Sequence, residues 1–87
     1  MPKDEASIYL GTLSNNTDLN NLGIGKYIKT SAVTGIINSP VSGSSFVIET
    51  RKIGPQYIQY IYVQDGTMFY RIKWSSNWLA WNKFSTT

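Results

Sequence analysis

Residues 56–84 read QYIQYIYVQDGTMFYRIKWSSNWLAWNKF and hold all three tryptophans and two of the three phenylalanines of the chain. Two runs of β-branched and aromatic residues flank Asp65-Gly66 in this segment. An Asp-Gly pair between two such runs is a strong hairpin signal, because a type I′ turn requires positive φ at both central residues. The sequence therefore predicts strands at residues 56–64 and 67–74, joined by a tight turn.

The rest of the chain extends this β pattern. Four further segments have the composition of strands: residues 8–10, 26–30, 46–53 and, as a last strand, regular or bulged, 78–84. Thr17 or Asp18 is placed to cap one helical turn that ends at Gly23. Residues 31–45 are rich in Gly, Ser and Thr, which predicts a long loop with at most an edge strand at residues 35–37.

Composition limits the fold to one small domain. The chain has 87 residues and a net charge of +3, and a chain of this length buries only a thin core. We place the domain at residues 8–87, after a polar tail or linker at residues 1–7. The expected fold class is all-β: a small antiparallel sheet or sandwich around the central Asp-Gly hairpin, with at most one short helical turn. No segment approaches the roughly 18 apolar residues of a membrane span, so we expect no membrane insertion and no signal peptide.

Strand alternation assigns two faces to the hairpin. A turn made of Asp-Gly alone predicts one aromatic and basic face that carries Tyr60, Tyr62, Phe69, Arg71 and Lys73. It predicts a core face that carries Ile61, Val63, Met68, Tyr70 and Ile72. The candidate binding or interface residues are Tyr60, Tyr62, Phe69 and Arg71. Their face is a surface of mutually packed rings, an oligomer interface or a ligand platform, and a one-residue change of register would exchange the two faces.

No catalytic group or metal site is indicated by the sequence. The chain has no histidine and no cysteine, which removes the usual general base and the usual zinc ligands. Its five carboxylates are scattered: Asp4, Glu5, Asp18, Glu49 and Asp65. Gly23-Ile24-Gly25 follows a helical turn and is better explained as a cap and turn than as a phosphate-binding loop. We therefore expect no enzymatic activity, no cofactor and no bound metal.

Several short motifs occur in a fixed order from about Asp18 to Phe84. They are Asp18-Leu19-Asn20 with Leu22, Gly25-x-Tyr27, Asn38-Ser39-Pro40 with Gly43, Gln59, Tyr70-Arg71 and Trp78-x-x-Trp81. With these motifs the chain resembles the pyocin-knob family of phage tail-fibre domains. It departs from the family at Leu79-Ala80, where a serine after the first tryptophan is more usual, so no family-typical polar contact is expected at this position.

The resemblance implies a structural or adhesive domain in a fibre or baseplate protein of a phage or phage-tail-like particle. Such a domain would be a component of the virion, assembled in the host cytoplasm, with a role in host attachment. The implied partners are two further copies of the parent fibre protein in a homotrimer, other tail or baseplate proteins, and a bacterial surface glycan or wall polymer. The domain by itself is compatible with a monomer if a neighbouring stalk supplies most of the trimer contacts. The resemblance implies no catalysis and identifies no residue that contacts a ligand.

Three motif residues also have a direct structural interpretation. Trp78 and Trp81 are interpreted as core or interface anchors, since burial of an indole removes a large apolar area from water. Gln59 lies on the predicted core face and is interpreted as a buried amide that satisfies backbone groups of a loop.

Two other functional classes remain open. Aromatic side chains interleaved with Arg and Lys on one sheet face would also suit a β domain that binds single-stranded nucleic acid. The net charge of only +3, spread along the chain, argues against nucleic acid as a partner. The remaining alternative is a purely structural connector between neighbouring parts of the particle.

Overall fold

The computed structural model describes residues 9–84, and within this range seven strands form one sheet. The strands are β1 (Tyr9–Thr12), β2 (Gly25–Lys29), β3 (Phe46–Ile53), β4 (Gln56–Val63), β5 (Met68–Trp74), β6 (Asn77–Trp78) and β7 (Asn82–Lys83). A single 3-10 turn, η2 (Leu19–Asn21), is the only helix in the described range. The predicted all-β class with one short helical turn is therefore confirmed, whereas the predicted tail at residues 1–7 lies outside the described residues.

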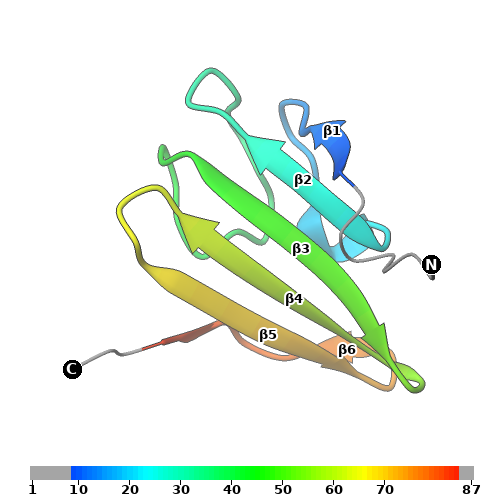
Figure 1. Ribbon diagram of the computed structural model, residues 1–87. Coiled ribbons are helices and arrows are strands. Elements are labelled where there is room, and N and C mark those ends of the chain that lie inside the picture. The colour runs from blue at the N-terminus through cyan, green and yellow to red at the C-terminus, as the bar shows by residue number, and fades with distance from the viewer. Residues whose placement is uncertain (1–8, 85–87) are drawn as a thin grey trace, which may run out of the picture.

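The sheet has a simple strand order. It runs β1-β2-β3-β4-β5-β6, and β7 pairs with β5 beside β6. The four long strands β2 to β5 lie side by side and are antiparallel to their neighbours (Figure 1). β1 pairs with β2 in parallel, which requires a crossover between them. Residues 13–24 with η2 provide that crossover, so the fold is one mixed sheet rather than two stacked sheets.

The last predicted strand is divided. Residues 78–84 do not form one strand, because β6 pairs with the end of β5 at Trp74 and β7 pairs with β5 nearer its start at Tyr70. Between them the chain leaves the sheet, and the indole N–H of Trp81 donates to Asn38 O at 2.8 Å. The segment predicted as an edge strand at residues 35–37 forms one isolated bridge, between Ile37 and Asp18.

The β4–β5 hairpin turns at Asp65-Gly66, as predicted, but its loop is one residue longer. Gly66 N donates to Val63 O at 2.9 Å, and Val63 N donates to Thr67 O at 2.8 Å. Gly66 has a φ of 94°, whereas Asp65 is not among the described non-glycine residues with positive φ. This geometry is a type I turn followed by a left-handed glycine, the common three-residue hairpin loop. The predicted type I′ turn is therefore wrong.

The longer loop shifts the register of β5 by one residue. Tyr60 opposes Tyr70 rather than Arg71. The face assigned to each β4 residue is right, but the two faces of β5 are exchanged. Tyr60 and Tyr62 share the face that we call the outer face. Phe69 and Arg71 lie on the other, inner face, so the prediction that grouped all four residues is wrong.

The hydrophobic core lies on the inner face of the sheet. Its buried members are Leu13, Leu19, Phe46, Ile48, Ile61 and Val63. Leu19 belongs to η2, and the loop between β2 and β3 passes behind the strands on the same side (Figure 1). Within residues 9–84, the short helix and the loop between β2 and β3 therefore cover the inner face.

Candidate functional site

The outer face of the sheet is an open apolar surface. Exposed large apolar side chains on it are Ile28, Ile53, Tyr62, Trp74 and Phe84. Ile53 and Trp74 are each 60% exposed, and the ring of Phe84 lies 5.0 Å from that of Tyr70. Among the described residues, the helix and loops that could form a second layer pack on the inner face. Several large exposed apolar side chains on one open face are characteristic of an interaction site.

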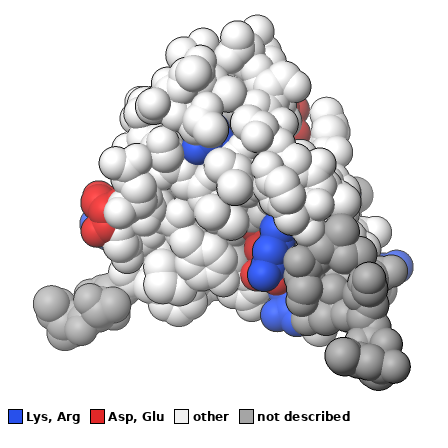
Figure 2. Space-filling model, turned by 45° about the horizontal axis from the view of Figure 1, so that its top comes forward, with Lys and Arg blue, Asp and Glu red and all other residues white. Residues whose placement is uncertain are grey.

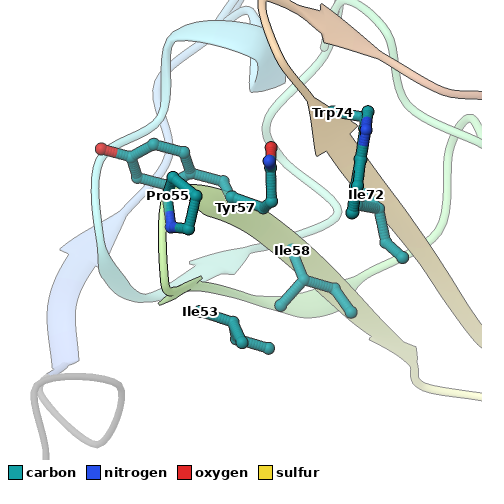
Figure 3. Close-up of a pocket in the computed structure, with 7 residues that line it drawn as sticks. Ile53, Pro55, Tyr57, Ile58, Ile72 and Trp74 are labelled. Carbon is teal, nitrogen blue, oxygen red and sulfur yellow. The ribbon is translucent and has the colours of Figure 1, made fainter.

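The outer face is hollowed where β3 turns into β4. The hollow has a volume of about 480 Å³, and its walls include Ile53, Pro55, Tyr57, Ile58, Ile72 and Trp74. Figure 3 shows Pro55 and Tyr57 on one side of it and Ile72 and Trp74 on the other, with Ile53 and Ile58 between them. The volume lies within the range of protein ligand pockets, roughly 300–1,000 Å³. The mostly aliphatic and aromatic walls favour an apolar occupant.

Tyr60 and Tyr62, two of the predicted site residues, lie in the middle of the outer face. Their rings are stacked, with centroids 6.5 Å apart. Burial raises the pKa of Tyr62, and the nearby Glu49 carboxylate raises it further. Glu49 Oε2 lies 3.9 Å from Arg51 Nε. The structure thus keeps both tyrosines at the predicted surface and surrounds them with a carboxylate–guanidinium pair that the sequence did not indicate.

Arg71, another predicted site residue, is buried. It is 4% exposed, and its guanidinium carbon lies 4.3 Å from the ring centroid of Trp78 and 4.6 Å from that of Trp81. Its Nε donates to Gln59 Oε1 at 2.9 Å. A guanidinium that stacks on indole rings away from water gains strong cation–π attraction. We call Gln59, Arg71, Trp78 and Trp81 the guanidinium cluster.

Burial changes the protonation equilibrium of the guanidinium. Desolvation lowers the pKa of Arg71 to about 10, and the carboxylate of Asp18 acts in the opposite direction. Arg71 therefore remains a cation at neutral pH. Its Nη2 has no hydrogen-bond partner among the described residues, so the indole rings supply much of the charge stabilisation that hydrogen bonds would otherwise give. This is a structural role, and the side chain is out of reach of an external ligand.

Gln59 connects the sheet to the covering loop. It is 0% exposed, and its Nε2 donates to Leu19 O at 2.8 Å and to Thr50 Oγ1 at 3.2 Å. The prediction of a buried amide that satisfies loop backbone groups is confirmed. The tryptophans act similarly, because Trp81 packs against the core and Trp78 Nε1 donates to Asn20 O at 3.4 Å.

Asp18 joins two loops next to this cluster. Its Oδ1 accepts from Asn20 N at 2.9 Å, as predicted for a helix cap, and from Asn38 Nδ2 at 2.8 Å. These two hydrogen bonds, the backbone one first, lower the pKa of Asp18. Sequence reasoning missed the link to Asn38. Asn38 adopts the left-handed conformation, with a φ of 65°, which asparagine tolerates better than most residues.

The other described carboxylate in a loop also has a structural contact. Asp65 Oδ1 accepts from Thr67 N at 2.9 Å inside the hairpin loop. Within residues 9–84, no three His, Cys, Asp or Glu side chains come together as metal ligands. The same part of the chain contains no helix of the length and apolarity needed to cross a bilayer.

Comparisons of the chain with protein-family models, with curated proteins and with solved structures give no match. The resemblance to pyocin-knob domains therefore rests on the sequence motifs. In the fold, motif residues from distant parts of the chain meet at one place: Asp18, Asn38, Gln59, Arg71, Trp78 and Trp81 form or adjoin the guanidinium cluster. The motif pattern thus corresponds to the group of contacts that fastens the loops to the sheet.

Proposed function

We propose that the chain is a non-catalytic structural and binding domain of a phage or phage-tail-like particle, located in a tail fibre or the baseplate. Copies of the domain associate through the outer face as a homotrimer, and the assembled particle component contacts the bacterial surface. The observation that carries this proposal is the open apolar outer face, with Ile53 and Trp74 at its hollow. The ordered motifs around the guanidinium cluster support the fibre-domain assignment.

The outer face is close to the size of a small specific contact. β2 to β5 have five, eight, eight and seven residues, and at about 4.8 Å between strands and roughly 3.3 Å per residue they make a face of about 440 Å². Two such faces together approach the roughly 1,000 Å² expected of a specific protein interface. A small domain with a thin core commonly gains stability from association, and closed symmetry allows three sheets to face a common axis.

The chemistry of the hollow favours another copy of the chain over a sugar. Sugars carry hydroxyl groups that need hydrogen-bond partners when they are buried. Gln56 is the one lining side chain with an amide, and its Oε1 already accepts from Ser75 N at 3.1 Å. Aliphatic walls such as Ile58 and Ile72 instead suit the apolar side chains that the same face would bring from a partner. Glycan contact is therefore proposed for another surface of the assembled component.

The corrected register bears on the nucleic-acid alternative. That alternative depended on Arg71 and Lys73 interleaved with the tyrosines, but both basic residues belong to the inner-face set of β5. The outer face accordingly lacks the alternating rings and cations of β4 and β5 that would follow a phosphate backbone. A pure connector differs from the proposed domain in one respect, because it would associate but would not bind a surface polymer.

Site-specific crosslinking tests the proposed assembly, since the natural chain has no cysteine. Ile53→Cys places a thiol at the outer-face hollow, and Ser14→Cys places one on an exposed loop as the matched control. With a short bismaleimide, the Ile53→Cys protein should form covalent dimers at concentrations where the Ser14→Cys protein stays single. Equal yields from the two variants would argue against an outer-face interface. Loss of mass from a wall polysaccharide incubated with the natural chain would argue against a non-catalytic domain.

A further inference from the structure

A second hollow lies at the other end of the sheet. The first hollow lies near Ile53, the last residue of β3. The second lies near Phe46, the first residue of β3, and is lined by the end of β2 and the loop that follows it. It has a volume of about 260 Å³. Figure 2 shows this end of the molecule, where uncharged residues predominate and a small patch of basic atoms lies recessed between them. The walls of the hollow combine apolar side chains, those of Val33, Ile36 and Val41, with one charged and several hydroxyl-bearing residues.

Lys29 is the charged residue that lines this hollow. It ends β2, opposes Phe46 on the inner side of the sheet and is 3% exposed. Its Nζ donates to Ser44 O at 2.9 Å. None of the carboxylates in the described part of the chain forms an ion pair with it.

A cation in this position has unused binding capacity. A buried charge is costly unless it is paired or fully hydrogen-bonded. An ammonium group has three donors, and the Ser44 carbonyl accepts from one. Hydroxyl-bearing residues stand around the same hollow: Ser31, Thr34 and Ser42. Together these groups offer one positive charge and several hydrogen-bond partners to something that enters the hollow.

The walls of the hollow are held in place by the protein itself. Val33 N donates to Thr30 O at 3.1 Å, and Asn16 N donates to Thr34 O at 3.0 Å. Thr34 N in turn donates to Asn15 Oδ1 at 2.9 Å. A ligand would therefore meet a preformed loop and would lose less affinity to loop ordering than in a disordered site. The volume, slightly under the roughly 300 Å³ of small-molecule pockets, suits a single ligand unit.

We propose that this hollow binds the carboxylate or phosphate group of an acidic sugar or polyol unit, with the Lys29 ammonium as its counter-ion. The hydroxyl groups of Ser31, Thr34 and Ser42 hydrogen-bond to the same unit. The inference adds a ligand class and a location to the proposed host-surface role, on which its biological meaning rests. It does not involve the outer face, so ligand binding and association are separable properties of the chain.

Amide chemical shifts of the ¹⁵N-labelled chain test the site. The probes are sodium glucuronate for a carboxylate and glycerol 3-phosphate for a phosphate, with glucose and sodium chloride as the neutral and ionic-strength controls. At least one acidic probe should give saturable shifts confined to residues 29–45, and the controls should give none. Shifts with glucuronate alone assign a carboxylate ligand, and shifts with glycerol phosphate alone assign a phosphate. No saturable shift with either probe would overturn the proposal.

Two variants make the test specific. Lys29→Met removes the charge but keeps an apolar chain of similar length, which folded proteins often tolerate in place of a buried ion. Ser42→Glu adds a carboxylate at the exposed rim to occupy the ammonium and is not expected to disturb folding. Each variant should weaken binding of the acidic probe at least tenfold, whereas the control Lys26→Met should not. Unchanged affinity in folded Ser42→Glu, or equal weakening in Lys26→Met, would overturn the site. Crosslinking through Ile53→Cys should persist in the Lys29→Met background, which separates failure of this site from failure of the proposed assembly.

Discussion

The inner and outer faces of the sheet both combine polar and apolar side chains, but the polar groups of the inner face are buried beside the hydrophobic core. The covered inner face contains a buried guanidinium, a buried amide and a buried ammonium, from Arg71, Gln59 and Lys29. The open outer face contains isoleucines and aromatic rings around the charged pair Glu49 and Arg51, with Ile53 and Trp74 mostly exposed. Buried polar groups require particular partners, whereas apolar groups require only removal from water. The inner face therefore specifies how the loops attach, and the outer face remains available to another molecule.

The loops on the inner face contain little regular structure that could hold them in place. The 3-10 turn η2 has three residues, too short to be stable alone. Its position is fixed by Gln59 Nε2 at Leu19 O and by Trp78 Nε1 at Asn20 O. Side-chain to backbone hydrogen bonds thus hold η2 against the sheet, whereas in larger domains a longer helix is held by its packing.

The largest expected effect comes from removing the buried cation. Arg71→Ala leaves Gln59 Oε1 without its donor and opens a cavity beside both indole rings, so it should lower the free energy of unfolding by about 3–5 kcal/mol. Urea denaturation of the variant and of the exposed control Lys83→Ala measures the difference. A loss of less than about 1 kcal/mol would show that the guanidinium cluster does not hold the loops.

The next largest loss of stability is expected when the buried amide of Gln59 is removed. Gln59→Leu removes the amide that donates to Leu19 O and Thr50 Oγ1 and accepts from Arg71 Nε. It should cost about 2–3 kcal/mol because buried polar groups lose hydrogen bonds. The matched control is Gln64→Leu, at an exposed position of the hairpin loop, which should stay within about 0.5 kcal/mol of the natural chain. Equal denaturation midpoints for the two variants would contradict this account of Gln59.

A smaller loss of stability is expected when the Asp18 carboxylate, which joins two loops, is removed. Asp18→Ala removes the cap of η2 and should cost about 0.5–2 kcal/mol at neutral pH. The folded-state pKa of Asp18 lies below its ordinary 3.8, so its contribution is complete above that pH and is lost as the pH falls through the folded-state pKa. The stability difference from the natural chain should therefore shrink in acid. A difference that stays constant from pH 6 to about pH 2 would contradict the assignment.

The smallest effect on folding is expected at the outer face. Trp74→Ser changes a side chain that is 60% exposed. The free energy of unfolding, measured by thermal unfolding at low concentration, should change by no more than about 0.5 kcal/mol. Loss of several kcal/mol in the dilute monomer would place Trp74 in the folding core and would remove the contrast between the two faces.

How far the sequence predicts this molecule depends on the kind of feature. Alternation and turn residues locate β3 and the hairpin, because they act within a few residues. The register of β5 depends on the φ of one residue, Asp65, since two- and three-residue loops both suit Asp-Gly. Because of that single difference, Arg71 lies buried on the inner face and not on the predicted surface. The sequence signal for its surroundings was the pair of tryptophans that follows it, Trp78 and Trp81, whose rings stack on the guanidinium.

The loop attachments and the Lys29 hollow were beyond local pattern. Asn38 reaches Asp18, and Trp81 reaches Asn38, across separations of 20 and 43 residues, and no periodicity encodes such contacts. Lys29 lies in an alternating segment whose pattern gives its face but not the loops that bury it. The outer face was predicted correctly on β4, because Tyr60 and Tyr62 do not depend on the hairpin register.

Sedimentation equilibrium of the natural chain and of Trp74→Glu tests the central claim most directly, because a charge at the hollow should block association through the outer face without unfolding the domain. We expect the natural chain to approach three times its monomer mass as concentration rises, while folded Trp74→Glu remains a monomer. A natural chain that stays monomeric over the whole range, or a Trp74→Glu protein that associates as strongly as the natural chain, would contradict it.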